Sequence, residues 1–298
     1  TRLQVEHPVT EAITGQDLVE WQLRVASGEP LPMAQDALAI VGWAMEARLY
    51  AEDPAQAFLP SPGRLDAFAP GDGVRVDTGV DAGAEVSPFY DPMIAKLIAH
   101  GDTREEARMR LAGALDTTLV WPLRSNAGFL VRALEHPDFV AGTADTGLIA
   151  RAGDALLPPP LPGEAALADA AARLIGDAPM RGFRLNAPAQ RDARVLVAGR
   201  AVSVDVGHAP AVPHPPCASV RFTEAGQSWE MSAFRASGGA GASAGDGAIL
   251  SPMPGRVVAV EVAAGDAVTK GQRLVAVEAM KMEHGLVAPF DGTVAELH

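Results

Sequence analysis

The sequence predicts a multidomain α+β protein that ends in an all-β segment. Two stretches of unusual composition divide the 298 residues, a proline-rich stretch at 153–164 and a Gly/Ala/Ser stretch at 236–247. Residues 1–152 mix helical and strand periodicity, residues 165–235 show one helical pattern followed by strands, and residues 248–298 show strand alternation alone. Hydrophobic residues make up 48% of the chain and charged residues 20%, as in globular proteins. We therefore expect three domains joined by two linkers.

Overall charge and cysteine content narrow the classes of function. A formal net charge of -13 argues against binding to nucleic-acid phosphates, which attract surfaces rich in Lys and Arg. No run approaches the roughly 18 apolar residues that a membrane span needs. The single cysteine excludes an internal disulfide and fits a reducing compartment. We expect neither nucleic acid nor a membrane among the partners.

Both ends of the sequence look like cuts in a longer chain. The first residues are neither an initiator methionine nor a signal peptide, and the last ones stop partway through an alternating pattern. We therefore expect the chain to be a fragment.

The first segment opens with a helical pattern and continues with strands. The apolar spacing in Thr10–Ala26 predicts one helix, ended by Gly28 and Pro30. Gly42–Tyr50 alternates in the manner of a strand. Ser61–Val86 is rich in Gly, Pro and Val, which predicts short hairpins.

A second helix is expected over Thr103–Leu115. Thr103 is a suitable N-cap, because its hydroxyl can accept a hydrogen bond from a free backbone N–H of the first turn. Acidic residues in that turn favour the same helix. The apolar positions predicted to face the core are Met109, Leu111 and Leu115.

The middle segment predicts a small antiparallel sheet with one helix. Ala165–Ile175 reads as the helix. Arg194–Val197 and Ala201–Val206 alternate as strands, with Gly199 and Arg200 as the turn between them.

The last segment contains an internal repeat. Pro252–Val257 is echoed 37 positions later by Pro289–Val294. Such self-similarity predicts two related halves that pack against each other.

The most informative motif lies between these halves, Glu278-Ala279-Met280-Lys281-Met282-Glu283. Strand patterns on both sides place Lys281 at an exposed hairpin tip, where an amine on a long stem suits covalent modification. The alternative is an ordinary solvated lysine, but two flanking methionines on an exposed turn favour recognition. With Pro252-Met253-Pro254-Gly255 upstream, the motif resembles the biotinyl domain of biotin-dependent carboxylases. The resemblance implies a flattened β-barrel of the biotinyl/lipoyl type, biotin attached to Lys281, and a biotin protein ligase as partner.

A second motif is found at the start, Arg2-Leu3-Gln4-Val5-Glu6-His7-Pro8-Val9-Thr10-Glu11. Alternation predicts a strand with Arg2, Gln4 and Glu6 on one face, where they could hold a small oxyanion beside a general base. From these residues alone, an ion-paired sheet face is the better interpretation. The string, however, resembles the signature of biotin carboxylase, an ATP-grasp enzyme. That resemblance implies that Arg2, Gln4 and the backbone of Val5 bind bicarbonate, with Arg2 and Glu6 catalytic and Glu6 as the base.

Further positions match the same family. Arg48 resembles the arginine that stabilises enolised biotin, because a fixed guanidinium offsets charge on the ureido oxygen. The alternative is an ion pair of Arg48 with Glu46 or Glu52. The stretch from Tyr90 to Ile98 is similar to one near the biotin site, which implies substrate contacts from Tyr90 and Asp91. Trp121-Pro122 departs from the family, which commonly has a glycine there, so the turn at this point is uncertain.

The middle segment resembles the linking domain of methylcrotonyl-CoA carboxylase α subunits, on its helix-then-strand order and on Gly182–Asn186. The resemblance implies docking onto a carboxyltransferase β subunit, and so a hetero-oligomer. Propionyl-, acetyl- and geranyl-CoA carboxylases have comparable subunits and stay as alternatives, as does a non-catalytic biotin carrier. A pyruvate carboxylase arrangement would need a barrel between the first and last segments, for which too few residues are present.

The resemblance as a whole implies ATP- and bicarbonate-dependent carboxylation of biotin on Lys281, followed by carboxyl transfer on a partner subunit to an acyl-CoA, with 3-methylcrotonyl-CoA as the best candidate. ATP and Mg²⁺ or Mn²⁺ are expected as cofactors of the full-length enzyme. No phosphate-binding loop or metal-binding carboxylate pair is found here, so we expect no metal site and no carboxylase activity in this fragment alone. A bacterial cytoplasm is expected, with the mitochondrial matrix as the alternative.

Overall fold

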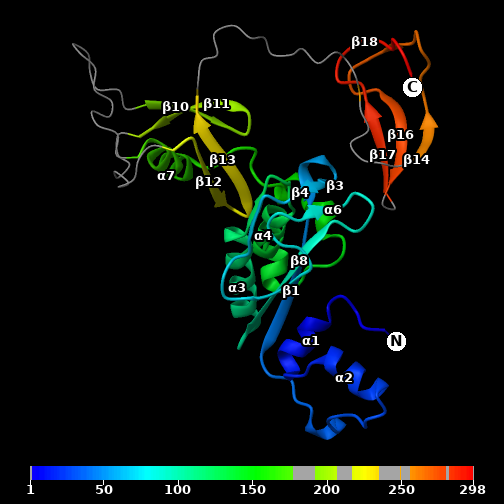
Figure 1. Ribbon diagram of the computed structural model, residues 1–298, viewed down its shortest axis with the longest axis vertical. Coiled ribbons are helices and arrows are strands. Elements are labelled where there is room, and N and C mark those ends of the chain that lie inside the picture. Colours follow the sequence, from blue (N-terminus) through cyan, green and yellow to red (C-terminus); the bar gives the residue numbers. More distant parts are fainter. Residues whose placement is uncertain are drawn as a thin grey trace. The chain divides into compact units, whose positions relative to one another are not determined.

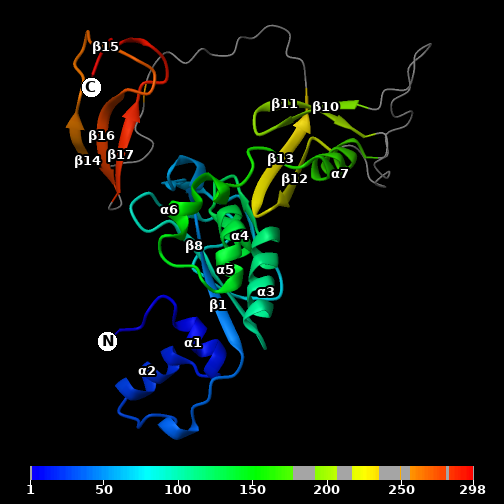
Figure 2. The same cartoon turned by 180° about the vertical axis from the view of Figure 1, so that it is seen from behind.

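The computed structural model describes residues 2–176, 192–206, 217–234, 249, 256–279 and 282–297 (Figures 1 and 2). Several predictions fall outside the described residues: those on Lys281 and Met280, on the stretch 236–247, and on the motifs at 182–186 and 252–255. The chain divides into two compact units, one of residues Thr1–Val86 and Met93–Arg235 and the other of Ser87–Pro92 and Ala236–His298.

The first unit contains most of the regular structure. Its helices are α1 (His7–Thr14), α2 (Leu18–Ala26), α3 (Arg104–Thr117), α4 (Ala127–Glu135), α5 (Pro137–Ala141), α6 (Leu148–Ala152) and α7 (Glu164–Ile175), with 3-10 turns η1 (Gln35–Ala37), η2 (Pro54–Gln56) and η3 (Gly153–Leu156). Its strands are β1 (Trp43–Tyr50), β2 (Glu52–Asp53), β3 (Leu59–Pro60), β4 (Gly63–Arg64), β5 (Ala67–Ala69), β6 (Arg75–Thr78), β7 (Glu85–Val86), β8 (Met93–Gly101), β9 (Leu119–Trp121), β10 (Asp192–Val197), β11 (Arg200–Asp205), β12 (Ser219–Glu224) and β13 (Gln227–Ala233).

The first helical stretch is two helices, so the prediction of one helix over Thr10–Ala26 is wrong. Gly15 ends α1 in the left-handed region, with φ of 68°, and its N–H donates to the carbonyl of Glu11 at 2.8 Å. Asp17 then begins α2 as its N-cap, because its side chain accepts the N–H of Glu20 at 2.8 Å. The chain therefore turns between the helices instead of continuing straight.

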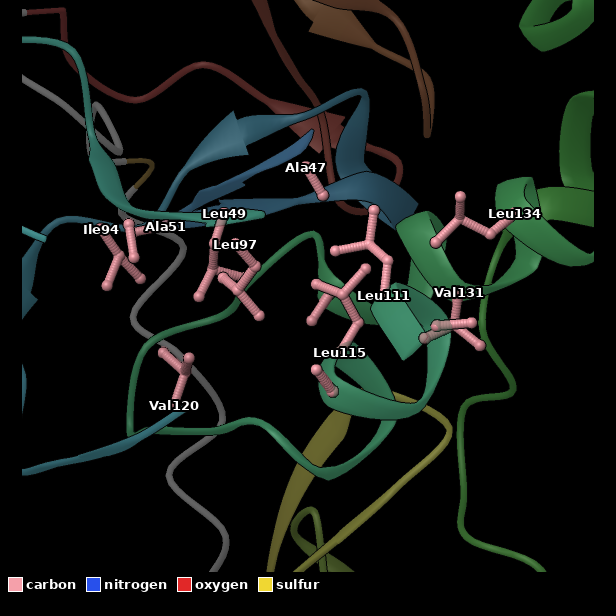
Figure 3. Close-up of a cluster of buried hydrophobic side chains, with 14 of the residues drawn as sticks. Ala47, Leu49, Ala51, Ile94, Leu97, Leu111, Leu115, Val120, Val131 and Leu134 are labelled. Atoms are coloured by element: carbon pink, nitrogen blue, oxygen red, sulfur yellow. The ribbon is translucent and has the colours of Figure 1, made fainter. Parts of the chain in front are cut away.

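An antiparallel sheet in the order β1-β8-β6 organises the first unit, and β1 confirms the strand predicted at Gly42–Tyr50. Alternate side chains of β1 point to opposite faces. On one face Leu49 and Leu97 pack with Leu111 and Leu115 of α3, all four nearly inaccessible to solvent (Figure 3). Each such leucine contributes about 1.5–3 kcal/mol on burial. The opposite face carries the polar residues of the candidate site.

The helix expected at Thr103–Leu115 is α3. The hydroxyl of Thr103 accepts the N–H of Glu106 at 3.1 Å, which confirms the N-cap. Leu111 and Leu115 are buried as predicted, but Met109 is 55% exposed. The prediction for Met109 is wrong because its side chain lies on the solvent side of the helix.

Residues 61–86 form short strands, as predicted, but few of them pair locally. β4 pairs with β7, whereas β5 pairs with β9 and β6 pairs with β8. The prediction of short hairpins is therefore wrong, because β4 and β7 pair across two intervening strands and the partners of β5 and β6 lie beyond residue 92. The Trp121–Pro122 peptide that follows β9 is cis.

The middle segment folds as predicted, with α7 packed on a sheet in the order β11-β10-β13-β12. Its core includes Leu167, Phe222 and Met231. The turn between β12 and β13 contacts the preceding domain, because the N–H of Gly226 donates to the carbonyl of Asp116 at 3.2 Å. The N–H of Val120 also donates to the hydroxyl of Ser228 at 2.9 Å.

The second unit is all-β in its last part, as predicted. Its strands are β14 (Arg256–Val260), β15 (Ala267–Val268), β16 (Arg273–Ala279), β17 (Met282–Val287) and β18 (Gly292–Thr293). They form a sheet in the order β14-β16-β17 and a separate β15-β18 pair. Val262, Val268, Leu274 and Ala288 form its small core.

Candidate functional site

The residues before α1 form a turn, so the strand predicted for Arg2, Gln4 and Glu6 is wrong. The N–H of His7 donates to the carbonyl of Gln4 at 3.1 Å, and α1 begins at His7. Pro8, in the first turn of α1, has the fixed φ that suits a helix start and not a strand. The side chains of Arg2, Gln4 and Glu6 are exposed and do not line one face of a sheet.

Two predicted site residues that are far apart in sequence meet here. The Arg48 guanidinium donates through Nη2 to Oε2 of Glu6 at 2.9 Å. Both side chains stay partly open to solvent, at 41% for Arg48 and 55% for Glu6. The arrangement joins a carboxylate that can accept a proton to a cation that can bind an oxyanion.

Lys96 adds a second cation beside Arg48. The strand register pairs Arg48 of β1 with Lys96 of β8, and Lys96 with Asp77 of β6, so the three side chains share one face. Lys96 Nζ donates to the carbonyl of Val5 at 3.1 Å and lies 3.6 Å from Oδ2 of Asp77. This contact fixes the peptide that follows Val5, next to Glu6.

The charged row continues from Asp77 to α1. Arg75 donates to both oxygens of Asp77, through Nε at 2.8 Å and Nη2 at 2.9 Å. Its Nη1 also donates to Oε2 of the buried Glu11 at 2.7 Å. Burial raises the pKa of Asp77, but hydrogen bonds and charge from Arg75 and the charge of Lys96 outweigh it and hold that pKa below its ordinary value. The hydrogen bonds that Arg75 makes to Asp77 and Glu11 in turn raise the pKa of Arg75.

Glu46 lies on the same face as Arg48, two residues earlier in β1. Its side chain is 4% exposed, and its Oε1 lies 3.8 Å from Nε of Arg48. Burial raises the pKa of Glu46, although the charges of Lys96, Arg48 and His7 oppose this. Glu46 and Lys96 are the site residues that the sequence did not single out, although Lys96 lies within the matched stretch that begins at Tyr90.

Tyr90 and Asp91 belong to the other unit, in the loop Ser87–Pro92. Tyr90 is 80% exposed. Their assignment to the substrate site stays a prediction.

The hairpin around the predicted biotin attachment site is partly described. β16 and β17 are antiparallel, with Glu278 paired with Glu283 and Ala279 with Met282. The pairing of β16 with β17 thus continues as far as Ala279 and Met282, and only positions 280 and 281 separate the two strands in the sequence.

The described ranges contain neither a candidate metal site nor a candidate membrane span. No three His, Cys, Asp or Glu side chains there come together in a way that could hold a metal ion. Nor does any helix in those ranges have the length and hydrophobicity needed to cross a membrane.

Comparison with known families assigns three parts of the chain, residues 1–34, 46–151 and 247–298. The biotin carboxylase C-terminal domain matches residues 46–151, which hold Arg48 and Lys96. A family described as biotin-requiring enzyme matches residues 247–298, and the ATP-binding domain of the carbamoyl-phosphate synthase L chain matches residues 1–34. The chain therefore contains the C-terminal domain of a biotin carboxylase and a biotin-requiring domain. The biotin-requiring domain indicates covalently bound biotin as a cofactor of this carboxylase.

Relatives of this carboxylase include several acyl-CoA carboxylase subunits, which are ligases. The mitochondrial methylcrotonoyl-CoA carboxylase subunit alpha of Dictyostelium discoideum is 37% identical over 100% of the chain and 52% of its own length. The propionyl-CoA carboxylase alpha chain of Ruegeria pomeroyi is 47% identical over 50% of the chain and 25% of its own length. The carboxylase chain thus spans about half of the first relative, and less of the second.

Solved structures agree with the fold of the first domain. The biotin carboxylase subunit of pyruvate carboxylase gives a TM-score of 0.52 at 38% identity, over 53% of this chain and 36% of that one. The Hydrogenobacter thermophilus 2-oxoglutarate carboxylase biotin carboxylase domain, solved with MgADP and bicarbonate, gives 0.52 at 37% identity over 53% of this chain and 36% of that one. The predicted fold class of the carboxylase is confirmed.

Proposed function

We propose that this chain is part of the biotin-containing subunit of an acyl-CoA carboxylase whose acyl substrate is 3-methylcrotonyl-CoA. The observation that carries the proposal is the alignment with the methylcrotonoyl-CoA carboxylase subunit, which extends over the whole chain, the middle domain included. The propionyl-CoA relative matches only about half of it. That half-length match, like those to the methylcrotonoyl-CoA carboxylase subunits of Arabidopsis thaliana and Mus musculus, supports the shared carboxylase chemistry and does not discriminate between acyl groups.

In the proposed reaction Glu6 accepts the proton of bicarbonate. Its carboxylate is 55% exposed and therefore open to a small ligand. Arg48 donates a hydrogen bond to its Oε2, which orients the carboxylate. Arg2, Gln4 and the backbone of Val5 would contact the bicarbonate oxygens, and Lys96 holds the carbonyl of Val5 in place.

Arg48 has a second proposed role, toward biotin. Bound biotin supplies a ureido nitrogen that accepts the carboxyl group. Arg48 would place its guanidinium against the ureido oxygen, where negative charge builds up in the transition state. Because Nη2 of Arg48 now donates to Glu6, that hydrogen bond must be exchanged for the one to the ligand.

We assign biotin attachment to Lys281. The antiparallel pairing of Ala279 with Met282 brings together the two residues that flank positions 280–281 in the sequence, which supports this assignment. The match to a biotin-requiring domain over residues 247–298 supports it independently. The carrier would take the carboxyl group to a carboxyltransferase subunit, and a biotin protein ligase would load it.

ATP enters the proposal only through the match of residues 1–34 to an ATP-binding domain. The described residues hold no cluster that fits a metal ion, so no contact with ATP or Mg²⁺ is assigned to them. These ligands, the transferase partner and a cytoplasmic or mitochondrial location are proposed for the whole enzyme.

Intact mass measurement after co-expression with a biotin ligase tests the attachment site. The chain contains only three lysines, Lys96, Lys270 and Lys281, so an adduct is easily localised by peptide mapping. We expect one biotinyl group, lost in Lys281→Arg and kept in the matched control Lys270→Arg. An adduct that survives in Lys281→Arg would contradict the assignment, as would a bare Lys281 in the subunit extended to the length of its relatives.

The acyl substrate is tested with the full-length subunit and its transferase partner. We expect kcat/KM for 3-methylcrotonyl-CoA to exceed that for propionyl-CoA, because a pocket that rejects one acyl group commonly discriminates by about 10- to 200-fold. The reverse ranking would assign the enzyme to propionyl-CoA. Biotin loading without bicarbonate-dependent ATP hydrolysis would instead indicate a non-catalytic carrier.

A further inference from the structure

Glu46 is a buried carboxylate that the proposed reaction does not yet use. Its side chain is 4% exposed, and neither Oε1 nor Oε2 accepts a hydrogen bond in the described part of the chain. A buried carboxylate without hydrogen bonds is costly, since both oxygens have lost their water. Such a residue needs an explanation other than stability.

The position of Glu46 relative to Arg48 suggests one. The Arg48 guanidinium is approached on two different edges: Nη2 lies 2.9 Å from Glu6, and Nε lies 3.8 Å from Oε1 of Glu46. Glu6 is half exposed and comes from the turn before α1, whereas Glu46 is buried and belongs to the same strand as Arg48. A ligand can therefore displace Glu6 from Nη2 while Glu46 keeps its place behind Nε.

Other charges around Glu46 do not replace this contact. Lys96, Arg48, His7 and Asp77 act on its carboxyl group electrostatically, the first three favouring the ionised form and Asp77 opposing it. Lys96 Nζ is already used by the carbonyl of Val5 and by Asp77. His7 donates or accepts through Nδ1 at the carbonyl of Gln4 and lies 3.9 Å from Glu11 through Nε2. Within the described ranges, Arg48 is thus the one cation within ion-pair distance of Glu46.

We propose that Glu46 is the positioning residue for Arg48: its carboxylate holds the Nε edge of the guanidinium, so that the Nη edge faces Glu6 and the incoming oxyanion. The inference rests on the proposed function of Arg48 and deepens it. Glu46 touches neither substrate nor biotin and acts through Arg48. Arg48 can then change partners, from Glu6 to a ligand oxygen, without changing the direction in which it points.

The ion pair itself is tested on the 298-residue chain, without any activity. The Nε–Hε resonance of Arg48, assigned by its loss in Arg48→Lys, is followed from pH 8 toward pH 4 in ¹⁵N–¹H spectra. We expect it to move as the Glu46 carboxylate takes up a proton, and to lose that transition in Glu46→Gln. Glu6→Gln should retain the transition, and Glu20→Gln, which removes an exposed pair with Arg24 on α2, should leave the spectrum of Arg48 unchanged.

A transition that persists in Glu46→Gln and disappears in Glu6→Gln would overturn the proposal. The remaining resonances of each spectrum report whether the variant is folded. If Glu46→Gln fails to fold, Glu46→Asp gives the answer instead, because its shorter carboxylate should reduce the pH-dependent shift of Arg48 Nε–Hε. An undiminished shift in the folded Glu46→Asp chain would also count against the contact.

The consequence for the reaction is tested in the full-length enzyme with free biotin as substrate. Glu46→Gln should lower kcat/KM for biotin by about tenfold, the usual size of one charge-assisted contact. Lysine has no Nε, so in an Arg48→Lys background the same change should have little further effect. Glu46→Asp should recover part of the loss.

Additive effects of Glu46→Gln and Arg48→Lys would show that Glu46 does not act through Arg48, and would overturn the positioning role. A wild-type enzyme that carboxylates no biotin would instead contradict the proposed function, while the Arg48 resonance still decides whether the ion pair exists. The two failures are therefore distinguishable.

Discussion

Asn126 holds the backbone of Arg48. Its Nδ2 donates to the carbonyl of Arg48 at 3.1 Å, and its Oδ1 accepts the N–H of Tyr50 at 2.9 Å. Asn126 lies at the start of α4 and is 7% exposed, so water cannot easily replace either bond. The C-terminal end of β1, which carries the guanidinium of the candidate site, is thus fixed by a helix that begins 78 residues later.

Replacing Asn126 should weaken the fold around Arg48. Asn126→Ala removes the hydrogen bonds to the carbonyl of Arg48 and from the N–H of Tyr50 in a poorly hydrated place, which should lower the free energy of unfolding by about 1–3 kcal/mol. Urea denaturation followed by circular dichroism measures this. Asn126→Asp keeps the acceptor and loses the donor, so its free energy of unfolding should lie between those of the wild type and of Asn126→Ala. Equal stability of Asn126→Ala and the wild type would argue against the clamp.

Asp77 should make stability depend on pH in the acid range. Its pKa is lowered in the folded state, so it contributes stability above its ordinary pKa of 3.8, and this contribution is lost as the pH falls through the folded-state pKa. Asp77→Asn should therefore be less stable than the wild type at pH 7, with the difference shrinking as the pH falls below about 4. Thermal unfolding at several pH values measures it. Exposed Asp36→Asn is the matched control, and a constant difference at all pH values would contradict the linkage.

Glu46 should show the opposite sign. Its pKa is raised in the folded state, so its contribution to stability is present at low pH and is lost as the pH rises above 4.5 and through the folded-state pKa. The free energy of unfolding of Glu46→Gln, relative to that of the wild type, should accordingly increase between pH 4 and pH 8. The increase should correspond to the ionisation of about one carboxyl group. Unfolding curves at both pH values check this. A relative stability that decreases over that range would mean that the ionised carboxylate is favoured by the fold.

Glu11 should determine how α2 attaches to the first unit. Its Oε1 accepts the N–H of Leu18 at 2.8 Å while its Oε2 binds Arg75, which connects α1, α2 and β6 through one carboxylate. Glu11→Gln should cost about 1.5–3 kcal/mol, the range for hydrogen bonds to charged groups. Limited proteolysis between the two helices, compared with Glu20→Gln on exposed α2, measures the loosening. Equal cleavage rates in both variants would show that Glu11 is not the attachment point.

Much of the fold was predictable where the signals are local. Thr103 as N-cap of α3, the helix α7, and strands β10 and β11 all follow from neighbouring residues. The turn between the two strands is Ala198-Gly199 and not the predicted Gly199-Arg200, because Arg200 already begins β11. The single helix over Thr10–Ala26 was wrong although Gly15 and Asp17 were readable stop and start signals. Apolar spacing continues on both sides of Gly15 and so predicts one helix, whereas the left-handed conformation of the glycine ends α1 there.

The candidate site was only partly predictable, because its decisive contacts are not local. Glu6 from the motif at residues 2–11 does meet Arg48, but the alternation of the motif predicts a strand where the chain turns and α1 begins at His7. From the sequence, Glu46 stands out only as an ion-pair alternative for Arg48. Its burial depends on β8 and α1, which no pattern within β1 reveals. Lys96 likewise gains its role from a register that joins β1, β8 and β6.

The turn at Gly226 limits how such subunits can be recombined. A Cβ at Gly226 would lie 2.7 Å from the backbone of Ala127 and Gly128, and one at Gly128 would lie 2.9 Å from the carbonyl of Ala225. The backbone of the turn at Gly226 therefore packs directly against the backbone at the start of α4. A chimera keeps this packing only if both parents have glycine at both positions. A chimera spliced in the proline-rich stretch at 153–164 separates them, whereas one spliced after residue 235 inherits them together. Exchange of carriers between carboxylases should thus succeed at the later crossover and fail at the earlier one.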